Sequence, residues 1–360
     1  MVLMKSENFS QNINLKEDIQ MKTLKKSLAL FLALIMALSL VACGAKEEPA
    51  PEKEEAPKAE QEAEAPADAL PIVGFTFFNV GANNYTSTYA NTINELMESE
   101  YAGKVELVML DAQGDAEKQL SDIDDLISMG CSSVILWPVS ATACVPGVQK
   151  LNEAGIPIIN TNSGVDASAQ DLLTAFSGPS DYNQGFQAGE AMVEALGGKG
   201  KVVELQGLAG YDTTNLRTQG FADAVAGTEI EILESQPADW STEKAQTIME
   251  TYLAKYGDEI NGCYCADDGI AEGAMNALEA IGKNDGSVAI TSPTLFASGY
   301  DAIAEGKQYA SVLQSPIEDA KLALQLAVTC ATGGTVEYDN RIPTWVVSQE
   351  NYTEFDRPTW

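Results

Sequence analysis

Polar and aromatic residues stand where the predicted parallel strands of this chain end. Asn79 follows the first predicted strand, Trp137 ends the third and Asn162 follows the fourth. The ends of the predicted strands and the segments that follow them also contain these polar and aromatic residues: Asn83, Asn84, Tyr85, Asp111, Tyr211, Asp212, Asn215, Arg217, Trp240, Asp267 and Asp268. Planar amides and carboxylates beside flat aromatic faces suit a hydroxylated ring. These residue types therefore predict a binding site for a small polar molecule.

Short apolar runs and helical patterns alternate from residue 72 onward and predict the elements that hold these residues. We expect strands at 72–78, 105–110, 134–137, 156–159, 201–205, 229–233, 262–266 and 287–290. Helices are expected near 141–154, 182–196, 214–225, 241–256, 269–281 and 298–305, with two more around Tyr89–Met97 and Leu120–Ile127. Two successive series of this kind predict an α/β fold with two Rossmann-like lobes, each built on a parallel central sheet. Ligands of such sheets bind beyond the carboxyl ends of the strands.

Composition and missing motifs exclude several classes of site. The 360-residue chain has no His and a formal net charge of −32, which disfavours nucleic acid as a partner and zinc as a metal. The first predicted strand is not followed by G-x-G-x-x-G, and no P-loop motif is present, so we expect no nucleotide cofactor and no metal. Five cysteines outside the N-terminal region are expected to be small buried hydrophobic residues: Cys131, Cys144, Cys263, Cys265 and Cys330.

The N-terminal region has the pattern of an exported lipoprotein. Three lysines precede an apolar run over residues 28–42, which is typical of a signal peptide. The run ends in Leu40-Val41-Ala42-Cys43, which resembles a bacterial lipobox and predicts lipidation of Cys43. We expect residues 1–20 to be a non-native extension with Met21 as the true start, 21–42 to be the signal peptide, and 43–70 to be the lipidated Cys and a disordered acidic tether. The chain is then extracytoplasmic and anchored to a bacterial cell membrane.

Several collinear segments resemble the type I periplasmic sugar-binding proteins, near their ribose-binding branch. They are K-V-V-E-L-Q-G-L-A-G at 201–210, R-T-Q-G-F at 217–221, S-Q-P-A-D-W at 235–240, A-D-D at 266–268 with E-G-A at 272–274, and V-L-Q-S-P at 312–316. The resemblance implies two lobes joined by a hinge that the chain crosses three times, with limits at 71–180 plus 315–344 and 181–314 plus 345–360. It also implies a monomer that delivers its ligand to the permease of an ABC importer.

The resemblance also assigns roles to particular residues. Trp240 lies where the family stacks an aromatic ring on the sugar, Asp267 where a side chain contacts hydroxyls, and Gln314 where a hinge residue reaches the ligand. Core packing of Trp240 and helix capping by Asp267 or Asp268 are the competing interpretations. The complete predicted ligand-binding set is Asn79, Asn83, Tyr85, Trp137, Asn162, Asn215, Arg217, Trp240, Asp267 and Gln314.

Three departures from the family pattern narrow the expected ligand. Asn162-Ser163 replaces an Asp-Arg pair, Asn215 replaces an Arg, and Thr294 replaces an Asp. Strongly anionic ligands are disfavoured, because they would require arginine forks. A neutral sugar or polyol fits better, as does a ligand whose amino group faces Asp267, Asp268 and the aromatic rings. Ribose itself is not favoured.

Two other functions remain open from the sequence. A signalling receptor of the same fold would sense a sugar, an autoinducer or an amino-bearing ligand. An exported carbohydrate enzyme would need two carboxyl groups facing each other across the substrate, whereas the adjacent Asp267 and Asp268 diverge at a strand end. We therefore expect a binding protein without catalytic residues.

Overall fold

The computed structural model describes residues 69–360. The predicted extension, signal peptide, lipidation site at Cys43 and nearly all of the tether lie outside these residues. Within the described part, no helix has both the length and the apolar character needed to cross a membrane.

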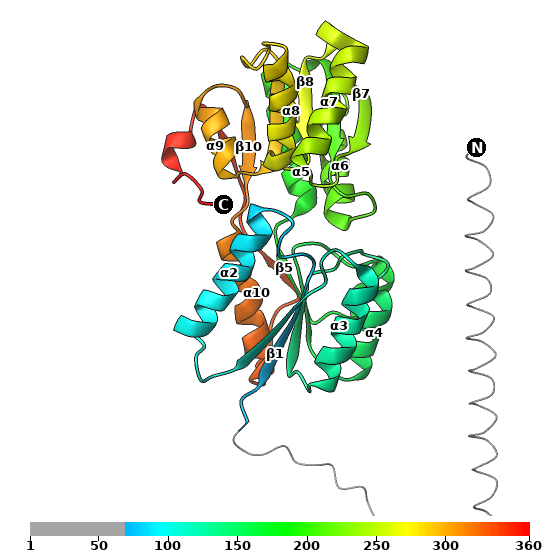
Figure 1. The fold of residues 1–360 in the computed structure, drawn as a ribbon, viewed down its shortest axis with the longest axis vertical. Helices are drawn as coiled ribbons and strands as arrows, with labels where there is room; N and C mark the ends of the chain where they lie inside the picture. Colours follow the sequence, from blue (N-terminus) through cyan, green and yellow to red (C-terminus); the bar gives the residue numbers. More distant parts are fainter. Residues whose placement is uncertain (1–68) are drawn as a thin grey trace, which may run out of the picture. The chain divides into compact units, whose positions relative to one another are not determined.

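The first lobe is built on a parallel six-stranded sheet in the order β11-β5-β4-β3-β1-β2. Its strands are β1 (Ile72–Phe77), β2 (Glu106–Asp111), β3 (Ser133–Leu136), β4 (Ile158–Thr161), β5 (Ala175–Gly178) and β11 (Asp339–Arg341). Its helices are α2 (Asn84–Ser99), α3 (Ala116–Ser128), α4 (Val145–Glu153) and α10 (Pro316–Ala331), with a 3₁₀ turn η1 (Ala167–Leu172). Helix α2 packs on α10, and α3 packs on α4, beside opposite faces of the sheet (Figure 1).

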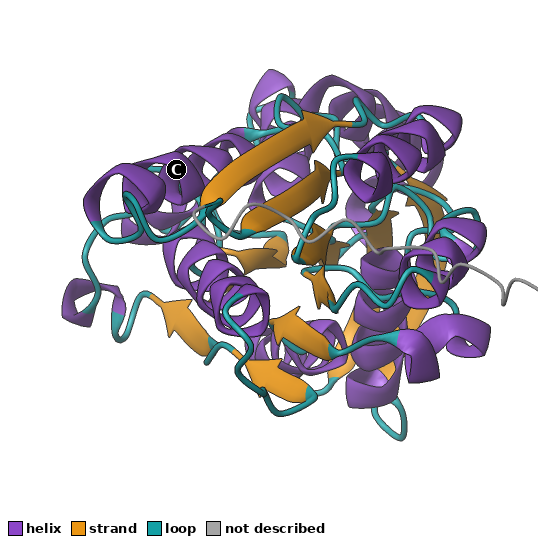
Figure 2. Cartoon of the chain, turned by 90° about the horizontal axis from the view of Figure 1, so that it is seen from below, coloured by secondary structure: helices purple, strands orange, loops and turns teal. Residues whose placement is uncertain are grey.

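The second lobe is built on a sheet in the order β12-β10-β9-β8-β6-β7. Its strands are β6 (Lys199–Gln206), β7 (Glu229–Pro237), β8 (Gly262–Cys265), β9 (Ala289–Thr294), β10 (Ala310–Leu313) and β12 (Trp345–Ser348), and only β12 is antiparallel to its neighbour. Its helices are α5 (Asp181–Leu196), α6 (Asp212–Val225), α7 (Thr242–Tyr256), α8 (Asp268–Ala280) and α9 (Ala297–Ala304), with turns η2 (Gly257–Glu259) and η3 (Tyr352–Glu354). Helices cover the strands on both sides (Figure 2).

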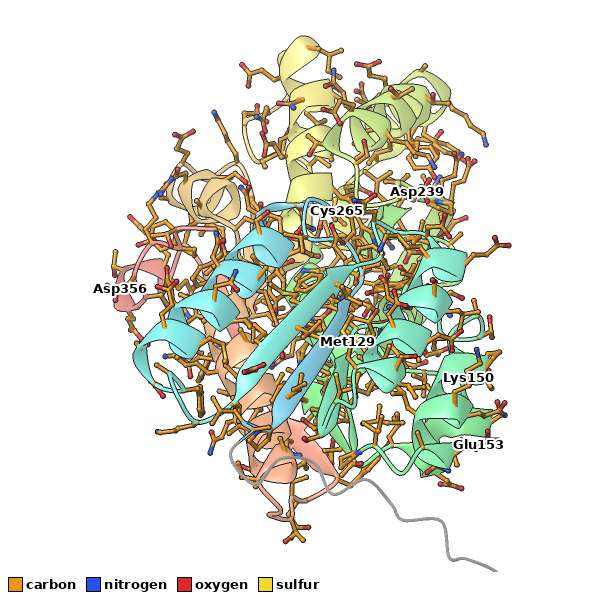
Figure 3. The ribbon with its side chains drawn as sticks, turned by 60° about the horizontal axis from the view of Figure 1, so that its bottom comes forward. Met129, Lys150, Glu153, Asp239, Cys265 and Asp356 are labelled. Atoms are coloured by element: carbon orange, nitrogen blue, oxygen red, sulfur yellow. The ribbon has the colours of Figure 1, made fainter. Side chains whose placement is uncertain are left out.

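Burial explains why the central strands are continuous apolar runs. In β1, Val73, Phe75 and Phe77 are fully buried, and so is Thr76 on the other face, because helices cover both sides of the sheet. The surrounding helices are amphipathic in consequence: Lys150 and Glu153 point outward from α4 (Figure 3), whereas the helix buries Val148 and Leu151.

The chain passes between the two sheets three times. The passages lie between β5 and α5, between β10 and α10, and between β11 and β12. Two of them lead directly into a helix whose first turn is capped by a serine: Ser180 Oγ accepts from Asn183 N, and Ser315 Oγ accepts from Glu318 N. The predicted α/β fold with two lobes and a three-crossing hinge is confirmed.

Several elements were not predicted as such, namely β5, β10, β11, β12 and α10. The expectation for the cysteines is confirmed, since all five in the described part are free and buried. Cys263 and Cys265 lie on one face of β8, with their sulfur atoms 3.6 Å apart.

Candidate functional site

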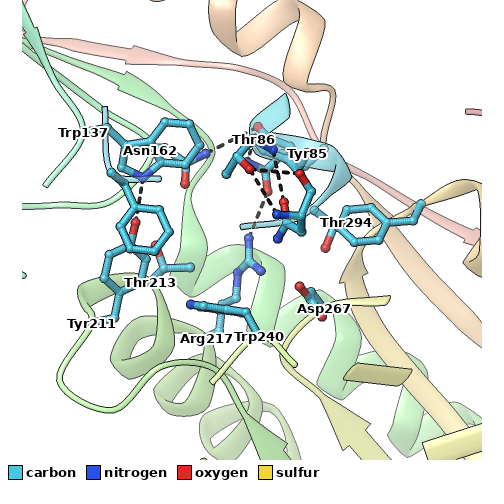
Figure 4. A pocket seen from close by; sticks show the side chains of 14 residues that line it. Tyr85, Thr86, Trp137, Asn162, Tyr211, Thr213, Arg217, Trp240, Asp267 and Thr294 are labelled. Carbon is cyan, nitrogen blue, oxygen red and sulfur yellow. Dashed lines mark hydrogen bonds between the residues drawn. The ribbon is translucent and has the colours of Figure 1, made fainter. Parts of the chain in front are cut away.

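A cavity lies at the carboxyl ends of the strands, with walls from both lobes. In Figure 4, Trp137, Asn162 and Tyr85 stand on one side of the cavity, with Arg217, Trp240 and Asp267 on the other. The complete lining is Phe78, Asn83, Tyr85, Thr86, Trp137, Asn162, Tyr211, Thr213, Arg217, Trp240, Asp267, Thr294, Phe296 and Gln314.

The loop before α2 places three lining residues through a capping box. Asn83 is the N-cap, and its Oδ1 accepts from Thr86 N at 3.1 Å. Thr86 Oγ1 in turn accepts from Asn83 N at 3.2 Å. This arrangement fixes Tyr85 and Thr86 in the first helical turn, where both are buried. It leaves the Nδ2 group of Asn83 without a partner among residues 69–360.

A buried network centred on Asp319 of α10 holds the first-lobe side of the cavity. Asp319 Oδ2 accepts from Tyr85 OH and from Asn162 Nδ2, each at 2.9 Å. Tyr85 OH also accepts from Gln314 Nε2 at 2.6 Å. Burial raises the pKa of Asp319 to about 7, although the hydrogen bonds from Asn162 and Tyr85 oppose that shift.

A second buried network holds Arg217 on the second-lobe side. Its Nε donates to Asp181 Oδ1 at 3.0 Å and its Nη1 donates to Ala266 O at 2.8 Å. Its Nη2 donates to Gln184 Oε1 at 2.8 Å and to Gln314 Oε1 at 2.9 Å. Burial raises the pKa of Asp181, and Arg217 opposes this by stabilising the ionised carboxylate. Gln314 belongs to both networks, so it links the two sides of the cavity at the hinge.

Arg217 is in reach of Asp181 because α5 and α6 approach closely. A Cβ atom on Gly185 would lie 2.0 Å from Arg217 O, and one on Gly220 would lie 2.1 Å from Tyr182 O. Only glycine allows this backbone contact.

Aromatic side chains form most of the remaining wall and connect the lobes. Trp137 Nε1 of the first lobe donates to Tyr211 OH of the second at 2.6 Å. The rings of Tyr211 and Trp240 are nearly perpendicular, at 78° with centroids 6.1 Å apart. Tyr85 and Trp137 meet at 87° and 6.2 Å. The cavity lining therefore contains aromatic rings in several orientations.

Three lining residues have left-handed backbone conformations that are unusual for residues with a Cβ. Their φ angles are 63° for Asn162, 60° for Trp240 and 101° for Thr294. Such strain is found at functional sites where the surroundings enforce it. For the loop after Thr294, Asp268 provides that support: its Oδ2 accepts from Phe296 N at 2.6 Å and from Ser311 Oγ at 3.1 Å.

The ring of Trp240 lies directly against the backbone of Gly207. A Cβ atom at Gly207 would lie 2.2 Å from Cη2 of the Trp240 ring. Trp240 is partly buried, packs against two hydrophobic core clusters and lines the cavity. Core packing and ligand contact are thus compatible roles for this residue.

Asp267 and Asp268 have different surroundings, although they are adjacent. Asp267 is the N-cap of α8, where its Oδ1 accepts from Ile270 N at 2.7 Å, and it also lines the cavity. Burial raises the pKa of Asp267 to about 6. Asp268 is fully buried and accepts from Ser292, Gln308, Ser311 and the Phe296 backbone. The expectation that Asp268 faces the ligand is therefore wrong.

The structure brings most of the predicted ligand-binding residues into one lining: Asn83, Tyr85, Trp137, Asn162, Arg217, Trp240, Asp267 and Gln314. Asn79 instead lines a wider cleft outside the cavity. Asn215 is exposed and does not line the cavity, because on α6 it points away from the face that carries Thr213 and Arg217.

The predicted ligand-binding set did not include six lining residues, although Tyr211 was predicted to lie at a strand end and Thr294 at a ligand position of the family: Phe78, Thr86, Tyr211, Thr213, Thr294 and Phe296. Phe78, Tyr211 and Thr294 could have been added to the predicted set from the sequence, since each lies at or just beyond a strand end. Thr213 could have been found from its spacing of four residues from Arg217. Of the described residues, Asp267 is the one carboxylate that lines the cavity, so no second carboxylate stands opposite it as glycoside hydrolysis would require.

Comparisons with known proteins agree with this geometry. Residues 73–335 match the family model described as periplasmic binding protein domain. The chain is 29% identical over 243 residues to the ribose import binding protein of Haemophilus influenzae, covering 68% of this chain and 81% of that protein. It is 29% identical over 239 residues to the xylitol-binding protein of Mycolicibacterium smegmatis, covering 66% and 67%. The structure of a solute-binding protein of an ABC transporter from Bacillus halodurans with bound myo-inositol superposes with a TM-score of 0.74 at 28% identity, covering 80% of this chain and 97% of that one.

Proposed function

Since this chain belongs to the family of periplasmic binding protein domains, we propose that it captures a small hydroxylated molecule, a sugar or polyol, and delivers it to an ABC importer. The relatives named for ribose, xylitol and myo-inositol support this class of ligand. The proposal describes a solute receptor that binds its ligand and does not transform it.

One observation carries the proposal: amides, a carboxylate and aromatic ring faces from both lobes line a single cavity at the hinge. A ligand held there contacts both lobes when they are closed and only one when they are apart. This difference in contacts favours the closed state, which is all that a ligand needs in order to drive closure. The direct hydrogen bond between Trp137 and Tyr211 indicates that the lobes meet across the cavity.

Three further parts of the proposal rest on the sequence. Lipidation of Cys43 would anchor the protein to the outer face of the cell membrane, and the tether up to residue 70 would separate it from the bilayer. The lobe limits 71–180 plus 315–344 and 181–314 plus 345–360 are supported by the membership of the two sheets. We expect a monomer, since capture and release require free movement of both lobes.

A thermal-shift screen of the purified protein tests the proposal. Neutral sugars, polyols, amino sugars and nucleosides are added at saturating concentration, and a ligand at about 100 times its Kd stabilises the folded state by roughly 2.7 kcal/mol. We expect members of the sugar and polyol classes to raise the Tm. Chemical conversion of the bound compound would overturn the receptor function.

A further inference from the structure

The charged groups of the cavity are not balanced. Arg217 and Asp267 are the charged residues in its lining. The guanidinium of Arg217 is occupied by its ion pair with Asp181, by Ala266 O and by the side chains of Gln184 and Gln314. Asp181 is 4% exposed and compensates the charge of Arg217 within the protein. Arg217 therefore presents little free positive charge to a ligand.

Asp267 is compensated less fully, although the charge of Arg217 and the backbone N–H groups at the start of α8 lower its pKa. Its side chain is 3% exposed, and it forms no ion pair with any Lys or Arg of residues 69–360. Its hydrogen-bond donor is the backbone N–H of Ile270, and no side chain of the described part donates to it. At pH 7.5, above its pKa of about 6, the carboxylate is ionised. The backbone N–H donor stabilises this carboxylate but does not neutralise its charge, so a cation placed beside it gains a strong interaction.

Aromatic side chains share the cavity lining with this carboxylate. Six aromatic residues line the cavity: Phe78, Tyr85, Trp137, Tyr211, Trp240 and Phe296. The face of an aromatic ring attracts a cation, most strongly when both are shielded from water. The pairs that meet at 78° and 87° give the lining rings in different orientations. The lining thus combines an unpaired carboxylate with a partial aromatic cage.

The cleft that leads to the cavity is lined by acidic residues, so it carries negative charge like Asp267. A wider cleft shares Phe78, Trp240, Asp267 and Phe296 with the cavity and opens to solvent. Its wall adds the carboxylates of Asp239, Glu243 and Glu272, and no Lys or Arg of the described residues is in that wall. Lys244 pairs with Asp239 from outside, which leaves Glu243 and Glu272 as uncompensated acids. Their field attracts cations toward the cavity and repels anions.

Polar groups for hydroxyls are present at the same time. Asn83 Nδ2 and Asn162 Oδ1 have no hydrogen-bond partner among the described residues, and both side chains line the cavity. Gln314 Nε2 donates one of its two hydrogens to Tyr85 OH and keeps the other. These donors and acceptors suit hydroxyl groups, so the cavity is not built for a simple quaternary amine.

We propose that the preferred ligand is a polyhydroxylated ring bearing one protonated amino group, of the amino-sugar or amino-cyclitol class, with the ammonium on Asp267 and the ring against Trp240. This inference rests on the proposed function and narrows its ligand class. It follows from the charges of the cavity: Arg217 is paired with Asp181, whereas Asp267 has no ion-pair partner among the described residues, and the ammonium of the ligand would become that partner.

Matched ligand pairs test the inference. Titration calorimetry at pH 7.5 compares glucosamine with glucose, galactosamine with galactose, and an inosamine with myo-inositol, and N-acetylated forms serve as neutral amides. We expect the amino member of at least one pair to bind at least about tenfold more tightly than its hydroxyl counterpart, a difference of about 1.4 kcal/mol. Acetylation removes the advantage.

Two substitutions locate the effect. Asp267→Asn removes the charge but keeps a side chain that caps helices well, so the fold is retained, which its unliganded Tm verifies. The ratio between amino and hydroxyl members should then fall to near one. Asp258→Asn removes an equal charge in η2, outside the cavity lining, where Asp258 pairs with Lys283, and should preserve the ratio.

The failures of the two proposals are distinguishable. If hydroxyl members bind as tightly as their amino counterparts, or if Asp267→Asn leaves the ratio unchanged, the inference about the amino group is overturned and the sugar-receptor function stands. If no sugar, polyol or amino derivative binds at all, both are overturned.

Discussion

Asp319 should make the free energy of unfolding depend on pH, and the sign and size of this effect follow from its surroundings. It is fully buried, and no Lys or Arg of the described part forms an ion pair with it. Its Oδ2 accepts from Tyr85 and Asn162, but its Oδ1 has no partner there. Burial raises its pKa from 3.8 to about 7, so the folded protein holds this proton to a much higher pH than the unfolded chain does.

The sign of the stability effect follows from proton binding. Between about pH 4 and about pH 7 the folded state retains a proton that the unfolded state has lost, so the free energy of unfolding falls as pH rises through this window. A shift of about three pKa units corresponds to roughly 4 kcal/mol. Asp319→Asn has no proton to lose and removes this contribution. We therefore expect the variant to gain stability relative to the natural protein as pH increases from 5 to 8.

Urea unfolding of both proteins at pH 5, 6, 7 and 8, without ligand, measures the difference. Asp301→Asn is the control, because Arg357 lowers the pKa of this surface carboxyl from 3.8. Asp301 therefore stays ionised from pH 5 to 8, and the curve of this variant should run parallel to that of the natural protein. If the curves of the natural protein and of Asp319→Asn run parallel across this range, the account of Asp319 is refuted.

Three further substitutions test the walls of the cavity and their support. Trp240→Ala should abolish the ligand-induced thermal shift and leave the unliganded protein folded. The expected loss of binding free energy is about 2 kcal/mol or more. Unchanged binding in calorimetry would remove Trp240 from the site. Gly207→Ala places a Cβ 2.2 Å from the Trp240 ring and should weaken ligand binding. The control Gly81→Ala, whose Cβ has no neighbour nearer than 3.8 Å, should bind as tightly as the natural protein. Equal affinities of the two variants would contradict the packing described for Trp240. Arg217→Met leaves Asp181 buried without its partner and should lower the free energy of unfolding by about 3–5 kcal/mol in urea, and a loss below about 1 kcal/mol would show that the pair is not needed.

The general position of the site was predictable because it depends on strand ends. Apolar runs locate the strands, and their carboxyl ends bring Trp137, Asn162 and Asp267 to one edge of each sheet. Asn215 shows the limit of that rule. It lies near a strand end in sequence, but the phase of α6 decides which side chains face the cavity, and this phase places Thr213 and Arg217 inward.

The networks behind the lining were not predictable from sequence patterns. Asp319 is 234 residues from Tyr85, and the ion pair between Asp181 and Arg217 joins two different helices. No local periodicity records such contacts, because they arise only when distant helices pack together. The left-handed backbone of Thr294 is equally hidden, since its support by Asp268 and Ser311 is tertiary.

A crystal structure of the protein with the tightest ligand from the screen tests the central claim most directly. The account predicts electron density for the ligand between the lobes, in contact with Trp240 and Asp267 on one side and with Asn83 or Asn162 on the other. Density outside the cavity, or contacts with one lobe only in a closed protein, would contradict it.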